Sequence, residues 1–364
     1  MKIFFDSKIS SIQKYGGISR MVFEMLKSLN NKKDIDKIFY RGAYVDKYDY
    51  KKEWFLKYYG FKAPLFLNNR LVNILDNVGN KFAYWLNNKP DLIYHSFYHR
   101  IPKNHKGPLV VHAYDMIQEL FYNMPKASAF KKKSFEKADL IIAISQSTKN
   151  DICKMYPINP DKVVVAHLGV NNIFFNEHQF SEKTKKPYML YVGSRLYDYK
   201  NFNLLLDTFI NKKYFLDFDL ILFGGEKEIT EDQKNKISGV NSEKWLKQEF
   251  GDDGKLSNLY KGAAVFIYPS IYEGFGIPPL EAMASGCPVI ASKSSSLPEV
   301  VGEAGLLFDP KSPEDLAIKI DRVINDKSLS NELILKGKER AKHFTWDKMT
   351  DIIYQQYMNF SSGK

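Results

Sequence analysis

The stretch VFIYPSIYEGFGIPPLEAMASGCPVIAS, residues 265–292, reads as one strand–helix–strand unit. Its first six residues are apolar and rich in aromatic and β-branched side chains, which is typical of a buried strand. Pro278 and Pro279 suit the first turn of a helix, and Gly286 suits the position just after its last turn. The final PVIAS predicts a second buried strand. A unit of this kind is the building block of a parallel sheet that is covered by helices.

Apolar runs alternate with amphipathic segments along the rest of the chain, and the alternation restarts near residue 188. We therefore expect two domains, at 1–175 and 187–343, joined by a polar linker at 176–187 and followed by a terminal helix at 344–364. Strands are predicted at 2–5, 37–40, 91–95, 109–113, 139–145 and 162–167, and then at 188–193, 219–224, 265–270, 288–292 and 305–308. Helices are predicted at 17–29, 66–88, 128–137, 146–156, 201–211, 255–262, 279–285 and 314–326.

Two carboxylates, Glu273 and Glu281, flank an uncharged turn that is rich in glycine and proline. The helix predicted at 279–285 places Glu281 in its first turn and Glu273 in the loop before it. The partial positive charge of a helix N-terminus keeps a nearby carboxylate ionised, so that it can accept hydrogen bonds from the hydroxyl groups of ribose or a hexose. Taken alone, the pair fits a helix-capping and a surface glutamate equally well.

Two cations, Arg195 and Lys200, follow a predicted strand in YVGSRLYDYKN (191–201). Cations beside a strand end suit a diphosphate, and they could neutralise the charge that builds up on a departing nucleoside diphosphate. Gly16 and Gly17 follow the first predicted strand and would let a ligand approach the N-terminus of the next helix closely. Each motif by itself also fits an ordinary charged loop or turn.

Together these motifs resemble those of the retaining glycosyltransferases of family 4. The resemblance extends over nearly the whole chain and is most specific in YEGFGIPPLEAMASG (272–286). It implies an α/β protein of the GT-B fold, in which two doubly wound Rossmann-like domains face a cleft and the C-terminal helix packs back toward the N-terminal domain. Its other carriers are Gly16-Gly17, Arg195 with Lys200, SLPEVVGEAGLLFDP (296–310), DMIQELF (115–121) and AISQSTKNDI (143–152).

The resemblance also implies a role for each motif. Glu281 would hold the ribose of a nucleotide-sugar donor, and Glu273 would contact the donor sugar. Arg195 and Lys200 would grip the diphosphate. The acceptor hydroxyl would attack from the side on which the diphosphate leaves, so that configuration is retained. The implied catalytic residues are Glu273, Arg195, Lys200 and Asp115, and the implied donor-binding residues are Gly16, Gly17, Arg195, Lys200, Glu273, Gly274, Phe275, Gly276, Glu281 and Leu297.

The N-terminal domain would bind the acceptor. The family often has His-Asp at the end of a strand in this domain, where the present chain has Tyr114-Asp115, with His112 two residues earlier. Residues two apart on a strand share a face, so either His112 or Tyr114 can meet the sugar. Arg20 and His95 are further candidates for contacts with the sugar or the acceptor.

No metal site and no cofactor are expected. Two Asp-x-Asp pairs, at 34–36 and 217–219, match a motif that holds a cation in other glycosyltransferases. Both precede predicted strands, at the wrong end of a sheet for a ligand, so we interpret them as turn residues. Arg195 and Lys200 would supply the positive charge instead.

The formal net charge of +11 indicates either a solvated, lysine-rich surface or an affinity for anionic partners. The scattered arginines and the lack of a nucleic-acid motif argue against nucleic acid. Tyr44–Lys62 mixes aromatic residues with lysines and so fits an anionic membrane surface or packing on its own domain. No apolar run is long enough to span a membrane, and the two cysteines are far apart. We expect a cytoplasmic protein that can attach to the inner face of the cytoplasmic membrane.

The expected activity is transfer of a hexose from GDP-mannose, or a similar nucleotide-sugar, to a glycan or lipid-linked glycan acceptor in surface polysaccharide or lipopolysaccharide synthesis. A nucleotide-sugar epimerase of the same fold is one alternative, and it would consume donor without acceptor. A non-enzymatic carbohydrate-binding protein is another, and it would not bind nucleoside diphosphates. A nicotinamide oxidoreductase would carry G-x-G-x-x-G after the first strand, where this chain reads DSKISSIQKYGG (6–17).

Overall fold

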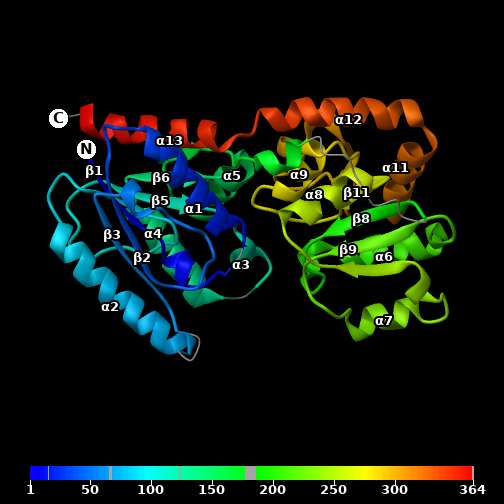
Figure 1. Ribbon diagram of the computed structural model, residues 1–364, viewed down its shortest axis with the longest axis horizontal. Helices are drawn as coiled ribbons and strands as arrows, with labels where there is room; N and C mark the ends of the chain where they lie inside the picture. Colours follow the sequence, from blue (N-terminus) through cyan, green and yellow to red (C-terminus); the bar gives the residue numbers. More distant parts are fainter. Residues whose placement is uncertain (15, 65–67, 123, 177–185, 363–364) are drawn as a thin grey trace. The chain divides into compact units, whose positions relative to one another are not determined.

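The computed structural model divides into two compact units, shown in Figure 1. Unit 1 comprises Met1–Gly169 together with Trp346–Lys364, and unit 2 comprises Val170–Thr345. Most of the predicted linker at 176–187 lies outside the described residues. The structure describes residues 1–14, 16–64, 68–122, 124–176 and 186–362.

Unit 1 is built on a parallel sheet whose strands, in the described residues, run in the order β3-β2-β1-β4-β5-β6-β7. The chain leaves β1 toward β2 and β3 and then crosses to the other side of β1 at β4, which is the doubly wound arrangement. The inner strands are buried along their whole length because helices cover both faces of the sheet. The strands are β1 (Lys2–Asp6), β2 (Asp36–Tyr44), β3 (Lys57–Lys62), β4 (Ile93–Ser96), β5 (Leu109–Ala113), β6 (Leu140–Ala143) and β7 (Val163–Val165).

Unit 2 repeats this arrangement. Its described strands run in the order β10-β9-β8-β11-β12-β13, again with the reversal beside the first strand of the unit. The predicted pair of doubly wound parallel sheets is therefore confirmed. The strands are β8 (Tyr188–Val192), β9 (Asp219–Phe223), β10 (Leu246–Glu249), β11 (Val265–Tyr268), β12 (Val289–Ser292) and β13 (Leu306–Phe308).

The helices lie between the strands in sequence, as expected for crossover connections. In unit 1 they are α1 (Gly17–Ser28), α2 (Asn69–Asn87), α3 (Ile117–Leu120), α4 (Pro125–Lys137), α5 (Gln146–Met155) and α13 (Trp346–Ser362). In unit 2 they are α6 (Phe202–Asn211), α7 (Glu231–Ile237), α8 (Asp253–Gly262), α9 (Ile277–Ala284), α10 (Leu297–Val301), α11 (Pro313–Asn325) and α12 (Lys327–Lys342).

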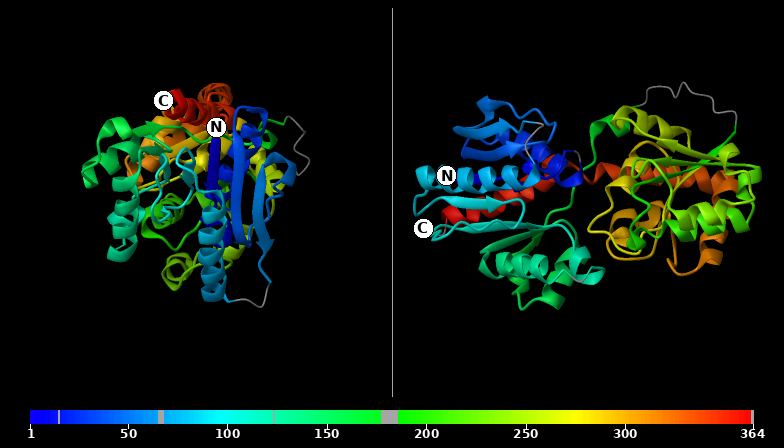
Figure 2. Two further views of the ribbon diagram at one scale, coloured as in Figure 1. Left: turned by 90° about the vertical axis from the view of Figure 1, so that its left-hand side faces the viewer. Right: turned by 90° about the horizontal axis from the view of Figure 1, so that it is seen from below.

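The C-terminal helix α13 belongs to unit 1, where it packs along α1, as Figure 1 and Figure 2 show. Tyr357 is the deepest anchor of this helix. Its ring packs edge-on against Phe5 of β1 at 6.3 Å, and its hydroxyl hydrogen-bonds to Nδ1 of His95 on β4. At the surface, Lys32 and Asp351 form an ion pair of 2.7 Å. The prediction that the last helix packs back on the N-terminal domain is confirmed.

Six of the described helices and strands were not predicted: β3, β10, α3, α7, α10 and α12. β3 (KYYGFK) and β10 (LKQE) each lie at one edge of their sheet and carry charged residues, which break up the apolar run of a typical buried strand. The helix α12 is charged over most of its surface, which hides its apolar stripe.

The aromatic segment Tyr44–Lys62 includes the end of β2 and all of β3. Within this segment Tyr50 and Phe55 are buried. The centres of their rings lie 4.9 and 5.0 Å from the centre of the Phe39 ring on β2. These aromatic residues therefore pack on their own unit, which was the second of the two interpretations given for this segment.

Candidate functional site

The site in unit 2 lies where the order of the strands reverses. β8 and β11 are neighbours there. The connection after β8 leads toward one edge of the sheet, at β9, and the connection after β11 leads toward the other edge, at β12. In doubly wound sheets ligands bind at the carboxyl ends of the strands beside this reversal. The loops that follow β8 (193–201), β11 (269–276) and β12 (293–296) carry most of the residues that the sequence singled out.

The loops after β8 and β11 are tied together by backbone and side-chain hydrogen bonds. The Ile271 N–H donates to the Tyr199 carbonyl at 2.7 Å. The Asn201 amide donates to the carbonyls of Pro269, at 3.1 Å, and Pro310, at 2.9 Å. Asn201 holds a left-handed backbone with φ of 55°, which asparagine tolerates better than most residues. One side chain thus fixes three loops at this edge of the sheet.

Serines of the loop after β12 hold the backbone around Glu273. The Glu273 N–H donates to the Ser295 hydroxyl at 2.8 Å. The Ser296 hydroxyl reaches the carbonyls of Glu273, at 2.9 Å, and Phe275, at 2.6 Å. The segment Glu273-Gly274-Phe275 is therefore positioned from a neighbouring strand end as well as from its own.

Lys200 and Glu273 form the central pair of the site. The Lys200 Nζ atom lies 2.7 Å from Glu273 Oε1, with the Tyr268 hydroxyl 3.5 Å from the same ammonium. Only 17% of the Lys200 side chain and 11% of the Glu273 side chain are exposed, so this pair is weakly screened. Burial and the Glu273 charge raise the pKa of Tyr268 well above its usual value, so Tyr268 is a neutral partner. The ammonium is held in place and yet reaches the surface of the unit.

Glu281 lies deeper in the helix than the sequence predicted. α9 begins at Ile277, so Glu281 is its fifth residue and lies outside the first turn. The prediction was wrong because Gly276, with φ of 116°, takes the N-cap position and lets the helix start before Pro278. Glu281 is almost fully buried, and the Tyr260 hydroxyl of α8 lies 3.5 Å from its Oε2.

Gly276 and Leu297 are in close contact. A Cβ atom on Gly276 would lie 2.9 Å from Leu297 Cδ2, which is too close. The positive φ of this residue also disfavours any side chain, so the position requires glycine. The Leu297 side chain is fully buried, and its N–H donates to the Ser294 carbonyl at 3.1 Å. Leu297 thus closes the packing beneath the loop after β11.

At its other end α9 stops as predicted. Gly286 has φ of 77°, and its N–H donates to the Met283 carbonyl at 3.0 Å. The next N–H, of Cys287, donates to the Ala282 carbonyl at 2.9 Å. This pair of bonds is the Schellman ending, and it confirms the predicted glycine cap.

Arg195 faces the neighbouring loop after β9. Its Nη1 atom donates to the Gly224 carbonyl at 3.0 Å, and Nη2 donates to the Glu226 carbonyl. Its backbone N–H and the Ser194 hydroxyl both bind the Glu226 carboxylate, at 2.8 and 2.5 Å. Although burial acts to raise the pKa of Glu226, these hydrogen bonds hold it below its usual value. The Nε atom of Arg195 is buried without a hydrogen-bond partner among the described residues.

Replacing Arg195 with methionine should destabilise unit 2. Two backbone carbonyls would lose a charged donor, which we expect to lower the free energy of unfolding by about 3 kcal/mol. Urea unfolding of the variant measures this loss, and Arg322→Met, at an exposed position of α11, is the control. An unchanged free energy of unfolding would contradict the supporting role of Arg195. A raised Kd for the donor in the same variant would separately support its predicted contact with the diphosphate.

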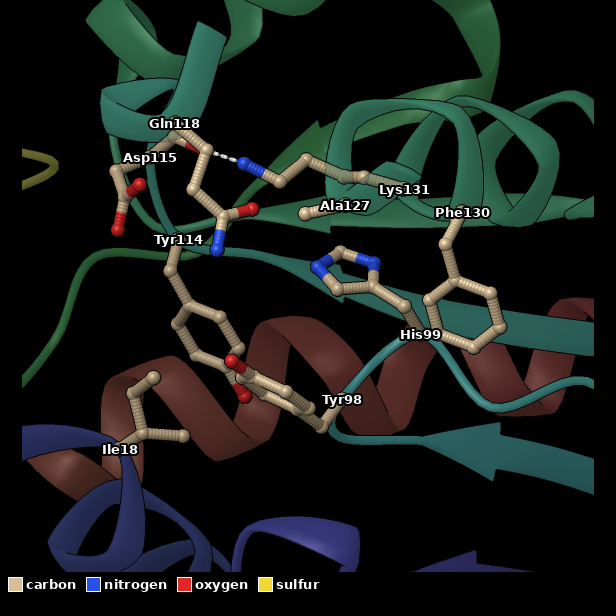
Figure 3. Close-up of a pocket in the computed structure, with 9 residues that line it drawn as sticks. All are labelled: Ile18, Tyr98, His99, Tyr114, Asp115, Gln118, Ala127, Phe130 and Lys131. Carbon is tan, nitrogen blue, oxygen red and sulfur yellow. Dashed lines mark hydrogen bonds between the residues drawn. The ribbon is translucent and has the colours of Figure 1, made fainter. Parts of the chain in front are cut away.

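A second candidate site is a pocket of about 160 Å³ within unit 1, shown in Figure 3. The Tyr114 hydroxyl donates to the Phe97 carbonyl at 2.7 Å, which fixes its ring on one wall. Lys131 on α4 donates to the Asp115 carbonyl at 3.0 Å and pairs with Glu119 at 2.9 Å. The pocket therefore combines aromatic walls with a cation. It is lined by Ile18, Tyr98, His99, Tyr114, Asp115, Gln118, Ala127, Phe130 and Lys131.

His95 and His112 lie away from the lining of this pocket. Their rings are fully buried, and His95 Nε2 lies 2.6 Å from His112 Nδ1. Burial lowers the pKa of His112 to about 3 and, together with His112, holds the pKa of His95 well below its usual value. The His112 Nε2 atom is buried without a partner among the described residues. Of the two candidates for a sugar contact, Tyr114 is the one that lines the pocket.

The buried histidines should make the protein sensitive to acid. Because His112 keeps a pKa of about 3 when folded, the unfolded chain binds a proton below pH 6.5 that the folded chain does not. Stability contributed by this neutral ring is complete above pH 6.5 and falls as the pH drops, by about 1.4 kcal/mol per pH unit. The free energy of unfolding, measured in urea at pH 6 and at pH 5, should fall less between these two pH values in His112→Gln than in the wild type, by that amount. His343→Gln, at an exposed position, is the control. An equal reduction in the pH dependence of its free energy of unfolding would contradict the assignment to His112.

Gly16 and Gly17 open α1, as predicted. The side chain of Gln13 occupies the space beside them, since a Cβ on Gly16 would lie 2.2 Å from its Nε2 atom. Gln13 Oε1 accepts from the N–H and the hydroxyl of Ser19, at 3.1 and 2.9 Å. A protein side chain thus already binds one of the free N–H groups at this helix N-terminus. Arg20 follows on α1 and is half-buried.

The Asp-x-Asp pairs lie at the amino ends of strands, as predicted, because Asp36 begins β2 and Asp219 begins β9. Sequence reasoning missed Glu226, Tyr268, Asn201 and the serines of 294–296. Gly224 and Gly225, which come just before Glu226, could have indicated that this loop passes close to another segment. A Cβ on Gly225 would lie 2.4 Å from the carbonyl oxygen of Gly193, so the loops after β8 and β9 can touch only at glycine.

Two family models match the chain. The model for glycosyl transferases group 1 matches residues 173–340, and the model for Glycosyltransferase Family 4 matches residues 15–172. The chain is 27% identical to O-antigen chain mannosyltransferase B of Escherichia coli, over 92% of this chain and 93% of that protein. It is 32% identical to O-antigen chain mannosyltransferase RfbU of Salmonella typhimurium, over 49% of each chain.

Solved structures share the architecture of the whole chain. Sucrose-phosphate synthase from Thermosynechococcus elongatus has a TM-score of 0.77 at 19% identity, with 100% of both chains covered. HepE of Anabaena, in complex with UDP-glucose, has a TM-score of 0.74 at 18% identity, again with 100% of both chains covered. No helix among the described residues is long and apolar enough to cross a membrane.

Proposed function

The chain belongs to the family 4 glycosyltransferases of the GT-B fold, and we propose that it transfers a hexose from a nucleotide-sugar to a glycan or lipid-linked glycan acceptor, with retention of configuration. The observation that carries this proposal is the Lys200–Glu273 pair at the reversal point of the sheet of unit 2. A carboxylate-anchored ammonium at this edge suits a ligand that joins a diphosphate to a sugar.

Each residue of the site has a proposed task. Lys200 neutralises the charge that develops on the leaving diphosphate, which is the main barrier to breaking the bond to the sugar. Glu273 orients Lys200 and accepts hydrogen bonds from the donor sugar. Glu281 accepts hydrogen bonds from the ribose. The Nε–H of Arg195, which has no hydrogen-bond partner among the described residues, is proposed as a donor to the diphosphate.

The acceptor hydroxyl attacks the anomeric carbon on the face from which the diphosphate departs. A phosphate oxygen of the leaving group takes the hydroxyl proton, so the reaction needs no separate carboxylate base. We propose that Lys200 and Arg195 supply the positive charge without a metal ion. Transfer that continues unchanged in excess EDTA is the expected result, and loss of transfer that Mg²⁺ or Mn²⁺ restores would contradict it.

The pocket of unit 1 is proposed to contact the acceptor or the transferred sugar. Tyr98 and Tyr114 offer aromatic faces on which the apolar side of a sugar ring can stack. Asp115 and Gln118 offer polar atoms for hydroxyl groups.

GDP-mannose is the first proposed donor, and a UDP-hexose is the second. The mannosyltransferase relatives support the first, and the solved HepE complex with UDP-glucose supports the second. The acceptor class is proposed from the same relatives, whose names refer to O-antigen chains. A cytoplasmic site of action, where nucleotide-sugars are made, is part of the proposal.

A panel of nucleotide-sugars tests the proposal directly. We expect one of them to raise the Tm of the protein and to be hydrolysed slowly without acceptor, because a ligand that binds only the folded state stabilises it. NMR of the first hydrolysis product should show the anomeric configuration of the donor. Conversion of the donor sugar to its epimer, or no stabilisation by any nucleoside diphosphate, would overturn the proposed function.

A further inference from the structure

The outward face of α2 in unit 1 is apolar. Trp85, Val78 and Phe82 are 72%, 61% and 59% exposed, and Leu71 and Ile74 are exposed as well. These residues are spaced by three or four positions and therefore form one stripe along four turns of the helix. Single exposed apolar residues are ordinary, whereas a continuous stripe marks a surface for contact with an apolar phase or partner.

The opposite face of the same helix already holds it on the sheet. Val72, Asp76 and Ala83 are buried there, and the Tyr40 hydroxyl of β2 donates to the Asp76 carbonyl. The Asp76 carboxylate pairs with Lys8 at 2.6 Å and with Arg100. The fold of unit 1 is therefore complete without the outward stripe.

The charges beside the stripe are positive. Arg70 and Lys81 are exposed on α2, at one border of the stripe, and neither pairs with a carboxylate among the described residues. Asp76, the acid of this helix, is buried and paired on the other face. An apolar stripe bordered by cations and a tryptophan is the pattern of a helix that lies in the interface of an anionic membrane.

The neighbouring edge strand β3 extends this surface. Lys57 and Tyr59 both bond to Asn87 of α2, at 3.0 and 2.9 Å, so their side of β3 faces the helix. Phe61 lies on the same side because alternate residues of a strand share a face, and it is exposed. The surface thus gains one more cation and one more aromatic ring beside the helix.

We propose that α2, together with the α2-facing side of β3, docks unit 1 on an anionic lipid surface. A second copy of the chain fits this face less well. A two-fold interface between two α2 helices would cover the stripe but would offer Arg70 and Lys81 no exposed acid of either helix as a partner. Anionic headgroups supply that charge, while the hydrocarbon boundary accepts the stripe. The inference rests on the proposed function only in that the acceptor is carried on a lipid.

Flotation with liposomes tests the docking surface. The wild-type protein should float with vesicles that contain phosphatidylglycerol and much less with pure phosphatidylcholine, and salt should weaken the binding. Phe82→Ser/Trp85→Ser and, separately, Arg70→Glu/Lys81→Glu should each weaken binding about tenfold or more. Leu335→Ser, at an equally exposed position of α12, is the matched control and should bind like wild type. Thermal unfolding checks that each variant is folded.

The outcome that overturns the inference is also defined. Equal flotation of the wild type and both double variants excludes α2 as the docking element. A concentration-dependent dimer in sedimentation that the Phe82→Ser/Trp85→Ser variant abolishes assigns the face to a second copy instead. Because the assay contains neither donor nor acceptor, its failure leaves the proposed transfer activity standing. Conversely, loss of the proposed activity leaves the binding result unchanged.

Discussion

Replacing Lys200 with methionine is expected to lower kcat about 10²-fold or more, because the leaving diphosphate loses the ammonium that neutralises it. Methionine keeps most of the length of the side chain, so the packing beside Tyr268 should persist. The Kd for the donor should change much less than kcat, since the charge on the phosphate grows as the bond to the sugar breaks. Steady-state kinetics with the donor found in the panel measures both quantities.

The control for this experiment is Lys236→Met. Lys236 pairs with Asp207 at 2.8 Å on the surface of the same unit, so its loss removes an equal charge away from the site. Its kcat should stay within about twofold of wild type, because surface ion pairs contribute little. If Lys200→Met retains the wild-type kcat, the Lys200–Glu273 pair is a structural ion pair and the proposed transfer mechanism fails.

Replacing Glu281 with glutamine should raise the Kd for the donor about 10- to 100-fold, the cost of losing charged hydrogen bonds to two hydroxyl groups. The kcat of the saturated enzyme should change little, because the ribose does not take part in the chemical step. Isothermal titration with the nucleoside diphosphate measures the effect without turnover.

A nucleoside diphosphate that lacks both ribose hydroxyls makes the assignment specific. Wild type and Glu281→Gln should bind this analogue equally, since the partners of the carboxylate are absent. The half-buried Glu249, which pairs with Lys255 at 2.6 Å, provides the control variant Glu249→Gln. If Glu281→Gln loses affinity for the analogue as well, Glu281 supports the packing of α9 against Tyr260 and does not contact the ribose.

The sheets were predictable because buried parallel strands are short apolar runs that need no knowledge of their neighbours. LVVHA at 109–113 forms β5 over the predicted range. The convergence of Lys200 and Glu273 followed from the same reasoning, since both come after strands that meet at the reversal point. The edge strand β3 was not predicted because its lysines, tyrosines and glycine form no continuous apolar run.

The direction of individual side chains could not be read from the sequence. Arg195 turns toward the carbonyls of Gly224 and Glu226, a choice that depends on where the loop after β9 ends. The start of α9 was misplaced because Gly276 adopts a left-handed backbone that no local pattern reveals. The exposed stripe of α2 was hidden for a similar reason. Its periodicity is that of any helix packed on a sheet, and only the structure shows that part of the apolar surface faces outward.

The anchoring of Tyr357 in unit 1 has a consequence for synthesis on the ribosome. Phe5 and His95 belong to the earliest-made strands, yet the side chain that covers them is translated after the whole of Val170–Thr345. The second unit can therefore complete its own sheet while the first still awaits its last helix. A released chain that ends at Thr345 should expose the first unit to proteases and protect the second.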